Sequence, residues 1–172
     1  MYDMQMIKYF MLLLVFIASS FIGRCIAKKY SYRLEELEEM KNILNVFKSK
    51  IRFTYEPIPE IFREIANNAK ENIGQIFEIA EKNMRDFSAG EAWENAVQTS
   101  ETNLTNEDLH VLLMLSKMLG QTDVEGQISQ IEITENFLEK QIKEAQQEKN
   151  KNEKLYRKLG TTIGLAIVII LI

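Results

Sequence analysis

An uncharged apolar run lies near each end of this 172-residue chain, and basic residues border each run on its inner side. The first run covers residues 9–23 and the second covers residues 159–172. Lysine and arginine collect on the cytoplasmic side of membrane-spanning segments. The pattern therefore predicts a cytoplasmic central region that is anchored in a membrane at both ends. The bordering basic residues are Arg24, Lys28, Lys29, Lys154, Arg157 and Lys158.

The two apolar segments differ in length. Residues 7–23, interrupted only by Lys8, reach the length of about 17–25 residues that a helical span needs. The second run has 14 residues, or about 21 Å of helix against a hydrocarbon core of about 30 Å. It spans only if Arg157 and Lys158 extend toward the headgroups or the bilayer thins, and a half-inserted anchor is the alternative. The expected organisation is an N-terminal transmembrane segment (1–27), a cytoplasmic helical bundle (28–158) and a short C-terminal transmembrane segment (159–172).

Cleavage of the first segment is not expected. Cys25 resembles the modified cysteine of a lipoprotein, but Arg24 stands where a small residue is required, and no small-x-small site precedes a plausible mature start. Cys25 is the only cysteine, which excludes an internal disulfide and is compatible with a reducing cytoplasm.

The central region has the composition of an all-α domain. Its two prolines, Pro57 and Pro59, share one turn, and no segment alternates as a strand would. We therefore predict a bundle of about six helices around one modest core. The first helix should continue from the membrane and end before Pro57. Its apolar stripe is Leu37, Met40, Leu44, Phe47 and Ile51, with Glu35, Glu36, Glu38 and Glu39 outside the stripe.

Capping residues predict the later helices. Short helices are expected from Pro59 to about residue 70, over 73–84, and after a capping box at residues 88–91. Thr105 should open an apolar helix that runs to residue 119 and ends at Gly120 in the left-handed conformation. Asp123 should cap a last long helix leading into the second apolar segment, with Glu135 facing solvent.

Charge is segregated along the chain. Residues 24–52 carry +4, residues 53–139 carry −12 and residues 140–158 carry +4, within a total of −4. Basic ends suit anionic headgroups, whereas an acidic middle favours basic partners and excludes nucleic acid; simple solubility is the alternative. The candidate partner-interface residues are Glu60, Glu64, Glu78, Glu81, Glu91 and Glu94.

The sequence offers little chemistry. His110 is the only histidine and has no accompanying nucleophile motif, and no metal-spaced cysteine and histidine set or glycine-rich phosphate loop occurs. We therefore expect no enzymatic activity, no catalytic residue, no cofactor or metal, and no small-molecule substrate.

Three groups of residues resemble a known family. They are Leu119 to Asp123 followed by Gln127, the helix start at Glu91 to Trp93, and Lys154 to Gly160 leading into the C-terminal apolar tail. In order and spacing they resemble stage III sporulation protein AB of endospore-forming bacteria, and the likeness spans the whole chain. The tail ends more abruptly than the family pattern, which weakens the expectation of a second span.

The resemblance implies a subunit of a channel complex in the mother-cell membrane that faces the engulfed forespore. The cytoplasmic region of that family is similar to helical domains of the platform protein in type II secretion and type IV pilus machines. Such a platform lies between a cytoplasmic ATPase and the membrane components, so other channel subunits and an ATPase become the expected partners. Without the resemblance, a doubly anchored membrane scaffold or a phage-type accessory protein fits the same sequence.

Overall fold

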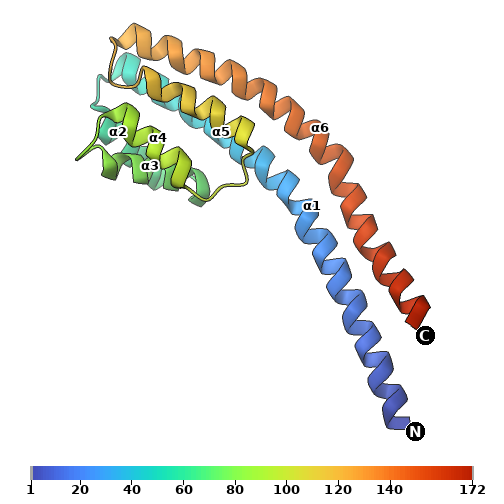
Figure 1. Cartoon of the computed structure of the whole chain (residues 1–172). Coiled ribbons are helices and arrows are strands. Elements are labelled where there is room, and N and C mark those ends of the chain that lie inside the picture. The colour runs from blue at the N-terminus through green and yellow to red at the C-terminus, as the bar shows by residue number, and fades with distance from the viewer. Residues whose placement is uncertain (1, 172) are drawn as a thin grey trace. The chain divides into compact units, whose positions relative to one another are not determined.

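The computed structural model describes residues 2–171, and the side chains of all of these except residues 2–4 and 71. All secondary-structure elements of the described residues are helices, with no strand among them, which confirms the all-α prediction. Its elements are α1 (Tyr2–Phe53), α2 (Ile58–Asn68), α3 (Glu71–Asn83), α4 (Ala89–Thr99), α5 (Asn106–Leu113), the 3₁₀ helix η1 (Met114–Lys117) and α6 (Val124–Leu171), most of which are labelled in Figure 1.

The chain divides into two compact units. Residues 33–144 form one unit, here called the body, and residues 1–32 with 145–172 form the other, here called the hairpin. Both long helices pass from one unit into the other. The basic residues that border the apolar runs belong to the hairpin, not to the body.

The body is built around the apolar stripe of α1, whose five predicted residues are all buried. Phe62 packs edge-on against Phe47 and Phe77, with ring centroids 5.2 and 5.0 Å apart. Trp93 joins this cluster at 5.6 Å from Phe62, and its Nε1 donates to the carbonyl oxygen of Leu112 at 2.8 Å. These rings contribute stacking energy beyond their buried area and join α1, α2, α3 and α4 in one core.

The predicted helix starts at Ser88 and Thr105 are confirmed, and each is a capping box. Ser88 and Glu91 exchange side-chain and backbone hydrogen bonds at the start of α4, and Thr105 and Asp108 do the same at the start of α5. Gly90 lies within the first box, between Ser88 and Glu91, and a Cβ there would collide with the carbonyl oxygen of Ser116. The start of α4 therefore approaches η1 more closely than any residue with a side chain would permit.

The predicted single helix over 105–119 is wrong in its second half. The α-helix ends at Leu113 and continues as the 3₁₀ helix η1. The Ser116 hydroxyl donates to the Leu113 carbonyl at 2.7 Å, a local bond of the kind that competes with regular α-helical pairing. The following turn agrees with expectation: Gly120 has φ of 70°, and Asp123 Oδ1 accepts from the backbone N–H of Gly126 at 2.9 Å.

In the hairpin, the two long helices lie side by side (Figure 1) and meet through small residues. A Cβ at Gly23 would lie 2.8 Å from the Cα of Gly160, and the Ser19 hydroxyl donates to the Gly160 carbonyl at 2.7 Å. Gly164 faces Ser19 one turn further along. Such contacts let helix backbones approach closely, as they do in membrane helix pairs.

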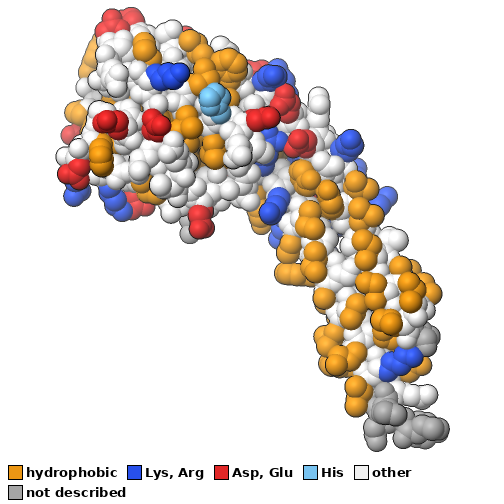
Figure 2. Space-filling view, viewed as in Figure 1, with side chains coloured by type: hydrophobic (Ala, Val, Ile, Leu, Met, Phe, Trp, Pro, Cys, Tyr) orange, Lys and Arg blue, Asp and Glu red, His pale blue; other side chains and the backbone are white. Residues whose placement is uncertain are grey.

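The exposed surface of the hairpin is apolar over most of the face seen in Figure 2. Among the described residues, α1 is the one helix that is long and apolar enough to cross a membrane. The apolar end of α6 remains a predicted second span.

Candidate interaction site

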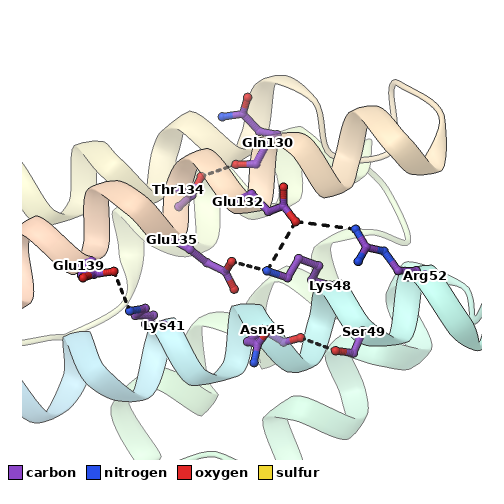
Figure 3. A network of polar contacts seen from close by, with 10 residues as sticks. All are labelled: Lys41, Asn45, Lys48, Ser49, Arg52, Gln130, Glu132, Thr134, Glu135 and Glu139. Carbon is purple, nitrogen blue, oxygen red and sulfur yellow. Dashed lines mark hydrogen bonds and ion pairs between the residues drawn. The ribbon is translucent and has the colours of Figure 1, made fainter.

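In the body, α1 and α6 are joined by a row of ion pairs, drawn in Figure 3. Lys48 Nζ lies 2.5 Å from Glu135 and 3.8 Å from Glu132, while Lys41 Nζ lies 3.2 Å from Glu139. The prediction that Glu135 faces solvent is wrong: its side chain is 12% exposed and pairs with Lys48 between the helices. Thr134, not Glu135, occupies the fully buried seam position.

A buried polar cluster joins α1, α5 and α6. Arg33 donates from Nε to Asp108 Oδ2 at 2.7 Å and from Nη2 to Asp108 Oδ1 at 3.0 Å. Gln141, with its amide oriented to satisfy its neighbours, donates to Asp108 Oδ1 at 3.1 Å. Sequence spacing missed this cluster, because Arg33 and Asp108 lie 75 positions apart in the chain.

Two opposing effects act on the Asp108 carboxyl. Burial raises its pKa, but the hydrogen bonds from Arg33 and Thr105, with the charge of Arg33, lower the pKa below the ordinary value for aspartate. Asp108 is therefore ionised in the folded body at neutral pH. The cluster has a structural role, because its side chains are buried between helices.

Two glutamates of α1 hold the short helices against it. Glu36 was predicted to lie outside the apolar stripe, but it is buried. Its carboxylate accepts from the backbone N–H of Asn103 at 2.7 Å and from the Asn72 amide at 2.7 Å. Glu39 accepts from the backbone N–H of Lys70 at 2.6 Å, at the start of α3. These acids satisfy backbone donors that loops and helix starts leave unpaired.

The six predicted interface acids have different environments. Glu81 is buried against Arg63, so its predicted outward position is wrong. Glu64 pairs with Lys50 at 2.6 Å, and Glu78 pairs with Lys82 one helical turn away. Glu91 belongs to the α4 capping box. Glu60, Glu91 and Glu94 are exposed without an ion pair among the described residues, and of these three only Glu91 is held in a capping box.

An exposed aromatic pair lies where α1 ends. Phe53 is 74% exposed and Tyr55 is 75% exposed, and Tyr55 has φ of 53°. That left-handed conformation closes many helices, but glycine usually adopts it, and a bulky residue there is strained. Strain of this kind is found most often at functional positions.

The turn around Gly120 and the starts of α2 and α4 lie next to one another near this aromatic pair. A Cβ at Gly120 would lie 3.0 Å from the Cβ of Ala89 and 3.8 Å from Ile58 Cδ1, so the Gly120 turn and the starts of α2 and α4 adjoin. We call this end the tip: the turn 54–57, the starts of α2 and α4, and the turn around Gly120. Phe87, which is 58% exposed, directly precedes Ser88, the N-cap of α4. The sequence pointed to the proline turn and Gly120 but not to the exposed aromatics.

The described residues contain no group of three or more histidine, cysteine or acidic side chains that would hold a metal. His110 is exposed on α5. In the hairpin, Arg24, Lys154, Arg157 and Lys158 line one open cavity, whereas Lys28 and Lys29 are exposed outside it.

Comparison with known proteins agrees with the fold. Residues 8–172 match the family described as stage III sporulation protein AB. The protein of that name from Bacillus subtilis (strain 168) is 24% identical over 170 residues, covering 96% of this chain and 99% of the relative. A solved structure of stage III sporulation protein AB matches with a TM-score of 0.63 at 20% identity, over 69% of this chain and 96% of that chain.

A helical body carried by a largely apolar helical hairpin defines the class: an α-helical protein suited to membrane association. The chain belongs to the stage III sporulation protein AB family, because the family match covers nearly its whole length. Its role therefore lies in sporulation, and the description of the family names no enzymatic activity.

Proposed function

We propose that this protein is a non-enzymatic membrane subunit of a channel complex in the mother-cell membrane during sporulation. In this proposal both ends of the hairpin are inserted in the membrane and the body lies in the cytoplasm. The body acts as a platform between a cytoplasmic ATPase and the membrane components of the complex.

The pairing of the helices supports insertion of both segments. Gly160 lies against Gly23, and Gly164 against Ser19, so the apolar end of α6 runs beside the apolar run of α1. An apolar groove lined by Tyr9, Leu12, Leu13, Phe16, Leu165 and Val168 continues this contact. If residues 9–23 lie in the bilayer, the end of α6 lies at the same depth.

The tip carries the docking part of the proposal. It combines a strained turn, exposed aromatic side chains and the exposed acid Glu60 in the first turn of α2. Aromatic residues are enriched at protein interfaces and supply much of the energy at their centres. Acidic side chains around them attract a basic partner and mainly raise the association rate. We therefore place the ATPase contact at the tip.

Tyr55→Gly separates docking from folding. Glycine adopts the left-handed conformation without strain, so this variant should melt at the same temperature as the wild type or higher. It also removes the exposed ring, so capture of the ATPase from sporulating cells should fall sharply. Phe137→Ala, which removes an exposed aromatic from α6, is the matched control and should retain capture.

A second variant tests the electrostatic part. Glu60→Lys with Glu94→Lys reverses two exposed charges that form no ion pair. The double variant should capture less ATPase, and the remaining capture should depend less on salt concentration. Glu64→Lys and Glu81→Lys are unsuitable, because both acids hold helices together. Capture of no ATPase by the wild-type chain would favour the scaffold alternative.

A further inference from the structure

The hairpin contains a polar cavity at the boundary between its apolar and basic parts. The cavity has a volume of about 480 Å³ and opens to the surface. Both long helices contribute to it. Its lining residues are Arg24 from α1 and Glu153, Lys154, Arg157, Lys158 and Thr161 from α6.

The position of the cavity along the helices defines its surroundings. Arg24 directly follows the uncharged run 9–23, and Lys158 directly precedes the uncharged run that starts at residue 159. The two runs pack against each other through Gly23 and Gly160, so both boundaries lie at one level of the hairpin. When the apolar runs are inserted, this level coincides with the lipid headgroups.

The charge of the cavity is strongly unbalanced. It contains four basic side chains and one acid, and none of the four bases forms an ion pair with a described carboxylate. Glu153 accepts a hydrogen bond from the Ser31 hydroxyl at 3.3 Å. The Thr161 hydroxyl donates to the Lys158 carbonyl at 2.8 Å and is therefore not free to donate to a ligand. The arginine and lysine side chains are the available donors.

We propose that this cavity binds the headgroup of an anionic phospholipid, with the lipid phosphate between Arg24 and Arg157 and with Lys154 and Lys158 completing its neutralisation. A guanidinium group can bind a phosphate through two parallel N–H···O hydrogen bonds. Basic pockets between membrane helices on the cytoplasmic side are suited to acidic lipids. The inference rests on the membrane insertion in the proposed function but not on ATPase docking. It assigns the two helices a shared lipid that anchors the basic start of the shorter inserted segment at the level of the headgroups.

The test uses the full chain, purified in detergent and titrated separately with dioleoylphosphatidylglycerol and dioleoylphosphatidylcholine. The rise in melting temperature with lipid concentration gives an apparent affinity. We expect phosphatidylglycerol to bind at least about tenfold more tightly than phosphatidylcholine, because basic residues near the membrane surface attract anionic headgroups. Inorganic phosphate at the same concentrations should neither raise the melting temperature nor compete with the lipid.

Matched double variants localise the effect. Arg24→Gln with Arg157→Gln should lose the tenfold preference, while Lys28→Gln with Lys29→Gln removes two nearby charges outside the cavity and should keep it. Lys154→Gln with Lys158→Gln tests the cavity independently if the arginine variant does not fold. Equal loss in the cavity and control variants would overturn the proposal in favour of diffuse attraction, and competition by inorganic phosphate would overturn the lipid assignment.

Flotation with vesicles tests membrane insertion of the hairpin separately from lipid binding in the cavity. All variants should remain membrane-bound, because the apolar runs are unchanged. A wild-type chain that does not float with vesicles would overturn membrane insertion and the lipid site together. A chain that floats but shows no preference for phosphatidylglycerol would overturn the lipid site alone.

Discussion

Arg33 of α1 and Asp108 of α5 form a buried two-point ion pair, with Nε 2.7 Å from Oδ2 and Nη2 3.0 Å from Oδ1. Asp108 is fully buried and also accepts from the backbone N–H of Thr105 at 2.9 Å. One carboxylate therefore closes a helix cap and ties that helix to α1. The pair lies in the body at the residue where α1 enters it.

Removing one partner of this pair should be costly. Asp108→Asn or Arg33→Ala leaves the other group inadequately paired in the interior, which typically costs about 3–5 kcal/mol. Replacing both, as in Arg33→Met with Asp108→Leu, should cost less than the sum of the single changes. Thermal unfolding of the full chain in detergent measures the stability loss of each variant. If the loss in the double variant equals the sum of the losses in the single variants, the two residues do not stabilise the body as a pair.

The ion pair between Arg33 and Asp108 also predicts that the stability of the body depends on pH. The folded-state pKa of Asp108 lies below its unfolded value of about 3.9, so its stabilisation is present above that value. The stabilisation is lost as the pH falls through the lowered folded-state pKa. The stability gap between wild type and Asp108→Asn should therefore be constant from pH 7 to pH 5 and narrow below about pH 4. A gap that does not change with pH would show that the ionised form is not the stabilising one.

The turn between η1 and α6 gives a third prediction. Gly120→Val forces a branched side chain into positive φ and toward Ala89, and should destabilise the body by about 1–2 kcal/mol. Asp123→Ala removes the cap on Gly126 and should cost about 0.5–2 kcal/mol. Melting curves of the full chain measure both. Unchanged melting with lost partner capture would instead make this turn an interface.

Local patterns in the sequence were enough to predict much of the fold. The stripe from Leu37 to Ile51, the capping box at Ser88 and the left-handed Gly120 each depend on residues within a few positions of one another. The break after Leu113 was missed, because a hydroxyl bonding to its own helix leaves the apolar periodicity unchanged.

The acids were harder to assign, because their roles depend on distant partners. Asp108 meets a residue 75 positions away and Glu36 meets one 67 positions away. Spacing along one helix identifies an acid outside an apolar stripe, but it does not reveal which loop will cover it. For that reason Glu36 was predicted only to lie outside the apolar stripe, and Glu81 and Glu135 were predicted to face outward, whereas all three are enclosed. The left-handed conformation of Tyr55 could not be predicted from the sequence, because tyrosine rarely adopts positive φ.

The membrane topology is a further prediction. With basic residues bordering both apolar runs on the inner side, both termini should lie outside the cytoplasm and the body within it. A reporter that is active only outside the cytoplasm should work when fused to either terminus and fail when inserted after Asn103. A cytoplasmic C-terminus would reduce the end of α6 to a half-inserted anchor.

The central claim, that the tip of the body docks a cytoplasmic ATPase, is tested most directly by site-specific photo-cross-linking in sporulating cells. A photoreactive amino acid would replace Tyr55, and in a separate strain it would replace Phe137. Phe137 is exposed on α6 and lies further along this helix than Glu132, which lines a pocket together with Tyr55. We predict a cross-link to the ATPase from position 55 and none from position 137. A cross-link from position 137 alone, or no ATPase cross-link from position 55, would contradict docking at the tip.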